Sequence, residues 1–340
     1  MAGMTLEQEI KDKARELGFD AVGITDASPL GREHAEHFQQ WLAHGCAGRM
    51  DYMTRNLDKR LDPAKLRKGA QSMIVVALNY KPQEVGAKSG SQHESSRSEI
   101  SNLKSNMPVP ASGSQSEISN LKSQIGRIAA YAQYEDYHAF IKSLLRELAS
   151  FLSVRAGRPD RYKICVDSAP LAEKALAVRA GLGFIGRNHV LIHPPLGPQV
   201  LLGELVTTLA LQPDEPHGGT CQNCDGCLKA CPTGALQSDG FLDAGRCISC
   251  LTQYPSQAEP APDTHGWLFG CDECLLACPF HQQAPPCANR QFKHRPDRAG
   301  LDLREVLALD HETFEARFAD SPIKRLGLEA LQRTARACLR

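Results

Sequence analysis

The sequence predicts a mixed α/β (α+β) region, followed by a compact cysteine-rich segment and a short helical tail. Segments typical of strands alternate with segments typical of helices up to about residue 209. Most of the 13 cysteines fall between residues 221 and 278, and apolar residues at helical spacing return after residue 301. We therefore expect three parts, at residues 1–213, 214–292 and 293–340.

The composition is that of an ordinary globular protein, with 42% hydrophobic and 23% charged residues and no formal net charge. A neutral chain has no overall field that attracts nucleic acid or membranes, so such a partner would have to meet a local patch. The first residues lack the pattern of a signal peptide, and no apolar run has the length of a membrane span. We therefore expect a cytoplasmic protein without a membrane anchor.

The first predicted element is a helix at residues 6–17. Thr5 and Gln8 have the spacing of a capping box, which satisfies backbone N–H groups at a helix start. Leu6, Ile10 and Ala14 line one face, and a glycine follows the last apolar position as a stop signal.

The following segments alternate in character before the pattern breaks. Residues 21–25 are a predicted strand, residues 31–69 are predicted to be helical and increasingly basic, and residues 72–80 are typical of a buried strand. Residues 83–124 are polar and contain the octapeptide Ser-Glu-Ile-Ser-Asn-Leu-Lys-Ser twice. We interpret them as a duplicated insertion that forms a mobile surface loop.

Beyond the insertion we predict a helix at 131–154, a strand at 162–166, a helix at 171–180 and strands at 189–193 and 199–209. After the second of these helices, Gly181, Gly183 and Gly186 match G-x-G-x-x-G. A dinucleotide-binding fingerprint needs a strand before the glycines and a helix after them, whereas here the order is reversed. We therefore predict a sharp helix-to-strand turn.

The cysteine-rich segment contains the most specific motif. Residues 221–232 have the pattern C-x2-C-x2-C-x3-C-P of bacterial-ferredoxin-like [4Fe-4S] clusters, in which the fourth cysteine binds the other cluster. A second copy at 271–279 lacks its leading cysteine, which Cys247 can supply. We therefore predict two clusters, cluster 1 with Cys221, Cys224, Cys227 and Cys278, and cluster 2 with Cys231, Cys247, Cys271 and Cys274.

Zinc and disulfide bonds are the alternatives for these cysteines. Zinc sites commonly use two separated pairs of ligands, which a third thiol at the same spacing does not suit. Disulfide frameworks are typical of small secreted proteins. The remaining cysteines are expected to be buried as small apolar residues, namely Cys46, Cys165, Cys250, Cys287 and Cys338.

Clusters transfer single electrons and bind no substrate, so the region before them has to hold the electron acceptor. A flavin, a corrinoid or a partner protein could fill this place. The chain has two Asp-x-His pairs, ending at His138 and His265, but neither has the following glycine that the usual lower-ligand motif of cobalamin requires. A corrinoid would therefore be held without such a histidine.

Several motifs together resemble the epoxyqueuosine reductase family, and the likeness covers nearly the whole chain outside the insertion. They are Val166-Asp167-Ser-Ala-Pro170-Leu-Ala-Glu173-Lys174, Gly181-Leu-Gly-Phe-Ile-Gly186-Arg187-Asn188, the cysteine run, Gly270-Cys271-Asp-Glu-Cys274, and Ser321-Pro-Ile-Lys-Arg325. The resemblance implies a cobalamin-binding N-terminal domain, a ferredoxin-like domain with two [4Fe-4S] clusters, and a short HEAT-like helical tail.

The resemblance also implies an enzyme that reduces epoxyqueuosine to queuosine in the tRNA anticodon loop, the final step of queuosine biosynthesis. Its partners would be tRNA carrying epoxyqueuosine and an external low-potential electron donor, and we expect a monomer. By resemblance, Asp167 donates a proton to the departing oxygen. Arg60, Lys174, Asn188 and His189, together with Asp167, are the expected cobalamin contacts.

Each of these interpretations has an alternative. Asp167 could instead cap the following helix, since Asp or Ser ahead of Pro170 is a good helix start. The chain could be a corrinoid reductive dehalogenase or a plain ferredoxin-type electron carrier. Basic residues at 55–68 and 321–340 favour a nucleic-acid substrate, with recognition of a base in a single-stranded RNA loop.

Overall fold

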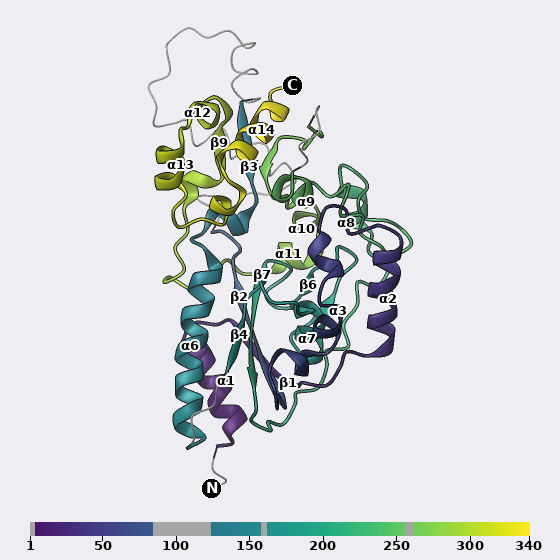
Figure 1. Ribbon diagram of the computed structural model, residues 1–340, viewed down its shortest axis with the longest axis vertical. Helices are drawn as coiled ribbons and strands as arrows, with labels where there is room; N and C mark the ends of the chain where they lie inside the picture. The colour runs from purple at the N-terminus through teal and green to yellow at the C-terminus, as the bar shows by residue number, and fades with distance from the viewer. Residues whose placement is uncertain (1–3, 84–123, 158–161, 256–260) are drawn as a thin grey trace. The chain divides into compact units, whose positions relative to one another are not determined.

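The computed structural model describes residues 4–83, 124–157, 162–255 and 261–340 (Figure 1). Contacts divide the chain into two compact units, each assembled from separate segments. Unit 1 contains Met1–Lys81, Tyr134–Cys247 and Asp272–Lys293, and unit 2 contains Pro82–Gln133, Ile248–Cys271 and His294–Arg340. The predicted insertion at 83–124 lies almost entirely outside the described residues. The predicted division into 1–213, 214–292 and 293–340 differs from the boundaries of these compact units, and it stays a prediction.

Unit 1 is built on a four-stranded sheet in the order β1-β2-β7-β4. Its strands are β1 (Ala21–Asp26), β2 (Ser72–Asn79), β7 (Val200–Thr207) and β4 (Lys163–Cys165). All three neighbouring pairs are antiparallel. The predicted mixed fold is therefore confirmed in its α+β form, because a parallel sheet would place crossover helices between parallel neighbours.

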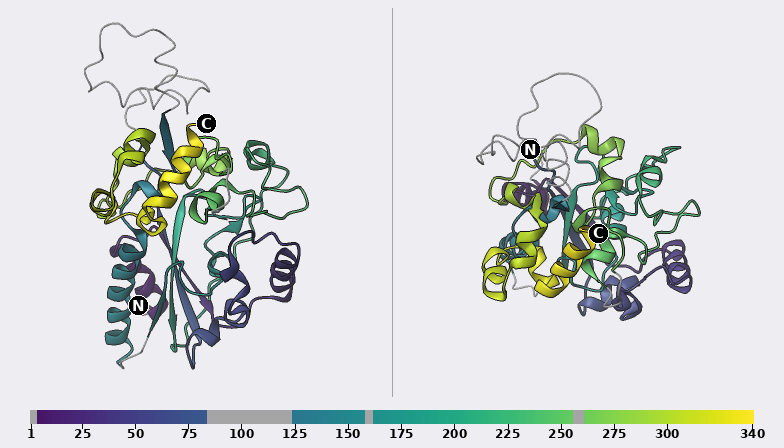
Figure 2. Two further views of the ribbon diagram at one scale, coloured as in Figure 1. Left: turned by 45° about the horizontal axis from the view of Figure 1, so that its top comes forward. Right: turned by 90° about the horizontal axis from the view of Figure 1, so that it is seen from above.

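Helices cover both faces of this sheet (Figures 1 and 2). α1 (Leu6–Glu16) and α6 (Tyr137–Arg155) pack on one face, and α7 (Glu173–Arg179) packs on the other. Side chains of β2 alternate between the faces, so Met73, Val75 and Ala77 join the core beside α7. Every residue of β2 is buried, as the apolar run predicted.

The predicted helix start is confirmed, since the Thr5 hydroxyl accepts a hydrogen bond from the Gln8 backbone N–H at 3.3 Å. The predicted helical stretch at 31–69 is interrupted. Gly45 and Gly48 adopt φ of 70° and 55°, which ends the first helix. The stretch divides into α2 (Arg32–Ala43), α3 (Leu57–Leu61) and the 3-10 turns η1 (Asp51–Thr54) and η2 (Pro63–Leu66).

The predicted turn after the glycine motif is confirmed. Beyond α7 the chain enters a hairpin of β5 (Phe184–Ile185) and β6 (Leu191–Ile192). Gly181 and Gly183 have φ of 78° and 149°. A Cβ atom at Gly183 would lie 2.1 Å from the carbonyl oxygen of Ile192, so the hairpin can close only over a glycine. Short helices α8 (Gly226–Ala230), α10 (Glu273–Leu276) and α11 (Pro279–Gln283) complete unit 1.

Unit 2 contains a three-stranded sheet with β3 (Ile125–Ile128) between β8 (Trp267–Phe269) and β9 (Gly300–Asp302). The predicted short helices are present, and Leu303, Val306, Phe314 and Phe318 belong to the core on which they pack. The HEAT-like character of the tail stays a prediction. The helical elements are η3 (Ala130–Gln133), α9 (Ile248–Gln253), η4 (Pro296–Arg298), α12 (Leu303–Ala308), α13 (His311–Arg317), η5 (Pro322–Leu326) and α14 (Leu328–Cys338).

Among the described residues, we find no helix with both the length and the apolar character that crossing a membrane requires.

We expect Gly183→Ala to lower the free energy of unfolding by about 3 kcal/mol, because it combines an unfavourable φ with a backbone clash. Gly218→Ala is the matched control, since a Cβ there meets nothing within 4 Å. Its effect should stay below about 0.5 kcal/mol. Urea unfolding of both variants checks this, and equal losses would contradict the strain argument.

Candidate functional site

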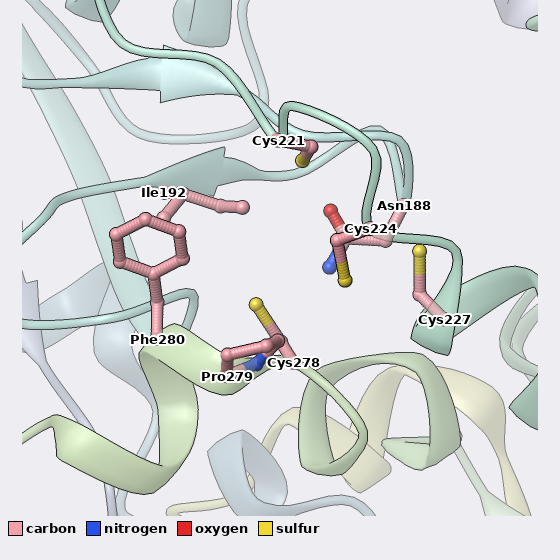
Figure 3. A pocket seen from close by; sticks show the side chains of 8 residues that line it. All are labelled: Asn188, Ile192, Cys221, Cys224, Cys227, Cys278, Pro279 and Phe280. Carbon is pink, nitrogen blue, oxygen red and sulfur yellow. The ribbon is translucent and has the colours of Figure 1, made fainter.

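Four of the predicted cluster ligands line one pocket in unit 1 (Figure 3). They come from two segments of the chain about 50 residues apart. One amide side chain and three apolar side chains complete the pocket wall. The lining residues are Cys221, Cys224, Cys227 and Cys278, with Asn188, Ile192, Pro279 and Phe280.

The local sequence explains how these cysteines come together. The Cys224 backbone N–H donates to the carbonyl oxygen of Cys221 at 3.1 Å, so the loop before α8 is tight. Cys278 is the N-cap of α11, and Pro279 is the first residue of that helix. Proline suits this position because the first helical N–H groups have no partner within the helix. The structure thus brings together the four residues predicted for cluster 1.

Four cysteine side chains around one pocket match the number of ligands that a [4Fe-4S] cluster takes. Sulfur atoms that surround a space fit a body of several atoms. Burial raises the pKa of the Cys227 and Cys278 thiols, and Cys221 and Cys224 beside them raise it further. A bound metal centre would stabilise the thiolate form of these side chains.

The residues predicted for cluster 2 are divided between the units. Cys231, Cys247 and Cys274 belong to unit 1, whereas Cys271 belongs to unit 2 at the boundary of that unit. Within unit 2, Cys271 packs against a small core of Ala129, Ile248 and Trp267. The second ligand set stays a prediction.

Asp167 directly follows β4 and Val166, and it adopts an uncommon left-handed conformation with φ of 56°. Its backbone N–H donates to Oε1 of Glu173 at 2.6 Å. The Tyr137 hydroxyl donates to Oδ2 of Asp167 at 2.7 Å, and Nε2 of His138 lies 3.5 Å from the same oxygen. The side chain is 62% exposed. Such a strained, accessible and oriented carboxyl group is typical of functional sites.

The alternative role of Asp167 as a helix cap is wrong. Helix α7 begins at Glu173, its N-cap is Ala172, and no side chain caps it. Asp167 therefore lies six residues before the helix, in the loop that joins β4 to α7.

The turn between β5 and β6 contacts the cysteine segments. The Arg187 backbone N–H donates to Sγ of Cys221 at 3.4 Å, and its guanidinium donates to the carbonyl oxygen of Cys224 at 3.2 Å. Asn188 is buried, lines the cysteine pocket and donates to the carbonyl oxygen of Cys274 at 3.5 Å. This turn forms one wall of the predicted cluster site.

The same turn also reaches the loop of Asp167. The carbonyl oxygen of His189 accepts a hydrogen bond from Nζ of Lys174. Lys174 is adjacent to Glu173, which holds the Asp167 backbone. A continuous series of contacts therefore runs from the cysteine pocket to Asp167. The predicted residues Lys174, Asn188 and His189 all lie along it.

The polar groups on this route are crowded yet accessible. Burial, followed by the charges of Lys174 and His37, lowers the pKa of His189 to about 4, so its ring is neutral at pH 7. Burial also lowers the pKa of Lys174, although solvent still reaches this side chain. A pKa lowered by burial, together with some access of solvent, is expected of groups on a recessed surface that a ligand can cover.

Arg60 supports the other side of the Asp167 loop. Its residue is buried, and its guanidinium donates to the carbonyl oxygen of Leu171 at 3.3 Å. The Nε atom of Arg60 is buried and has no hydrogen-bond partner among the described residues. It can therefore donate to an added ligand.

Sequence reasoning missed several residues of this site, namely Tyr137, His138, Glu173 and Glu204. His138 lies between two carboxylates, with Nδ1 2.7 Å from Oδ1 of Asp136 and Nε2 3.5 Å from Asp167. Its ring thus contacts a carboxylate on each side. Glu204 could have been noticed as the single acid in an apolar strand.

Two family models match this chain. Residues 60–168 match "Epoxyqueuosine reductase QueG, DUF1730". Residues 220–281 match the "4Fe-4S double cluster binding domain", which includes every predicted cluster ligand.

Similar proteins extend this likeness to nearly the whole chain. An epoxyqueuosine reductase from Pseudomonas aeruginosa is 35% identical over 95% of this chain and 82% of its own length. An epoxyqueuosine reductase solved with an epoxyqueuosine-modified tRNA-Tyr stem loop has a TM-score of 0.80 and 27% identity, covering 98% of this chain and 80% of that one. The Bacillus subtilis enzyme, solved with an aspartate catalytic loop swung out of the active site, has a TM-score of 0.79 and 26% identity, covering 98% and 81%.

We expect Cys278→Ala to reduce the iron content of the reconstituted chain from about eight atoms to about four, because it removes one ligand of cluster 1 alone. Cys46→Ala is the matched control, since Cys46 is buried and outside the motif. It should keep the full iron content. Iron and acid-labile sulfide analysis checks both, and full iron in Cys278→Ala would contradict this ligand assignment.

Proposed function

This chain belongs to the epoxyqueuosine reductase family of oxidoreductases, and on that premise we propose that it reduces epoxyqueuosine in tRNA to queuosine, with Asp167 as the proton donor. The observation that carries the proposal is the series of contacts from Cys221 through Arg187 and Lys174 to Asp167. It supports a path in which electrons arrive from the cysteine side and protons from the carboxyl side.

The residues fit the cofactors that this reaction needs. Cysteine thiolates are the usual ligands of [4Fe-4S] clusters, and four of them line one pocket. A corrinoid carries amide groups, which suit the Nε of Arg60, which has no partner among the described residues, and the accessible polar groups of Lys174 and His189. Asn188 is buried and belongs to the same proposed set of contacts. When bound, the clusters would supply single electrons at low potential and cobalamin a strongly reducing cobalt centre.

The protein contributes proton transfer and orientation. Conversion of an epoxide to an alkene releases water and consumes two electrons and two protons. The exposed carboxyl group of Asp167 can reach a ligand, and a positioned acid accelerates such a step by about 10²–10⁴-fold. Tyr137 and His138 both face Oδ2 of Asp167, which supports a fixed orientation of the carboxyl group.

The tRNA partner is proposed from the relative solved with a modified stem loop. A base in a single-stranded loop can be turned outward for recognition, and exposed basic residues can meet the phosphates. An external low-potential electron donor, a monomeric state and a cytoplasmic location belong to the same proposal. Exposed basic residues of the two predicted basic segments include Arg55, Lys65 and Lys68 in unit 1 and Lys324, Arg325, Arg336 and Arg340 in unit 2.

We expect Asp167→Asn to lower the rate of queuosine formation by about 10²–10⁴-fold, because an amide cannot donate the proton that the departing oxygen needs. Iron content should stay at the parent level, because Asp167 is not among the predicted cluster ligands. Asp263→Asn is the matched control, since Asp263 belongs to unit 2, is not among the residues proposed for the site, and has a side chain that is 77% exposed.

Initial rates come from nucleoside mass spectrometry of tRNA after anaerobic incubation. A parent-like rate in Asp167→Asn would remove Asp167 from the proton-transfer step. Bound cofactors with an unchanged nucleoside would favour a dehalogenase-like activity, and a chain that binds clusters but no cobalamin would favour an electron carrier.

A further inference from the structure

Two glutamates lie together beneath the loop that carries Asp167. Glu204 is in the middle of β7, where it pairs with Cys165 of β4 and Val75 of β2, and it is 0% exposed. Glu173 is the first residue of α7, and its Oε1 accepts the hydrogen bond from the Asp167 backbone N–H. The two carboxyl groups are neighbours, since each affects the pKa of the other.

Glu204 lacks the partners that an ionised carboxylate needs. Neither of its carboxyl oxygens has a hydrogen-bond donor among the described residues, and no described Lys, Arg or His forms an ion pair with it. A buried carboxylate without donors is strongly disfavoured, so the group keeps its proton. The protonated carboxyl can then donate to Glu173, which is the acceptor beside it.

The surrounding groups also favour the protonated forms of the two glutamates. Burial raises the pKa of Glu204, and the nearby charges of Glu173 and Asp167 raise it further. Burial and the charge of Asp167 raise the pKa of Glu173 to about 8, although hydrogen bonds from Asp167 and Glu204 and the charge of His138 oppose this.

The other ionisable groups near the pair are Cys165, Lys174 and Arg60. Burial and then the charge of Glu204 raise the pKa of the Cys165 thiol to about 12, so this thiol stays neutral. Burial lowers the pKa of both Lys174 and Arg60, and Glu173 partly offsets this shift in each. The pair therefore faces one further carboxylate, a histidine, a neutral thiol and two basic side chains.

We propose that Glu173 and Glu204 form a proton-sharing carboxyl pair that positions Asp167 and favours its protonated form. Glu173 fixes the backbone of Asp167 through its acceptor oxygen. Its residual negative charge also opposes a second charge on Asp167, since the repulsion between the two carboxylates is mutual. The role of the pair in turnover rests on the proposed function, whereas proton sharing itself does not.

Proton sharing is tested by the pH dependence of stability in the reconstituted chain. Both carboxyls have pKa values raised in the folded state, so their contribution to stability is present at low pH and is lost as pH rises. Between about pH 5 and 8, the unfolding constant of the parent should rise relative to that of Glu204→Gln by up to about tenfold per pH unit. Glu215→Gln is the matched control, because Glu215 is exposed.

Urea unfolding at each pH gives these constants, and Glu215→Gln should follow the parent. Parallel pH dependences of the parent and Glu204→Gln would overturn the inference. Infrared spectra of the unsubstituted chain supply a second test that does not depend on folding of a variant. A protonated-carboxyl band that persists at pH 7 is expected, and its absence at pH 7 would also overturn the inference.

Positioning is tested by the rate of queuosine formation across pH. Glu173→Gln keeps an acceptor oxygen for the Asp167 backbone, so its rate at acidic pH should equal that of the parent. As the pH rises, the rate of the variant should begin to fall at a lower pH than the rate of the parent. Glu173→Ala should lose rate at every pH measured. Equal profiles in both variants and the parent would overturn the positioning role. An inactive parent that still shows the stability difference would instead overturn the proposed function alone.

Discussion

The hydrogen bond from the Arg187 backbone to Sγ of Cys221 is the interaction on which the rest of the site depends. It attaches the cysteine loop to the turn between β5 and β6. The same turn also holds Lys174, whose Nζ donates to the carbonyl oxygen of His189. Since β5 follows directly from α7, the position of the cysteine pocket and the position of the Asp167 loop are set by one short stretch of chain.

This dependence explains why a glycine occupies the start of the hairpin. Gly183 lets the backbone of β5 pass close to the carbonyl oxygen of Ile192. A larger residue would clash with this backbone and disturb the hairpin whose turn places Asn188 at the cysteine pocket. The glycine motif is therefore structural, and it serves the site by closing the hairpin tightly.

Local patterns in the sequence were sufficient for much of the fold. Capping at Thr5, the apolar run of β2 and the spacing of the cysteines each depend on neighbouring residues. The first two predictions agree with the structure, and the four cysteines predicted for cluster 1 line one pocket. The continuous helical character expected at 31–69 failed because two glycines in left-handed conformations outweigh the helical spacing around them.

The polar network around Asp167 depends on long-range packing, which periodicity does not reveal. Tyr137 and His138 precede Asp167 by about 30 residues and meet it only because α6 packs beside β4. Glu204 reaches Glu173 because the register of β7 against β4 pairs it with Cys165. A single acid within an apolar strand was the visible signal, but its partner could be found only in three dimensions.

The measurement that tests this account most directly is the fate of the epoxide oxygen. The chain would be reconstituted anaerobically with iron and sulfide, with or without cobalamin, and incubated with a low-potential reductant and tRNA carrying epoxyqueuosine. We expect nucleoside mass spectrometry to show the loss of one oxygen atom only when cobalamin is present. An unchanged nucleoside in a chain that holds both clusters and cobalamin would contradict the account.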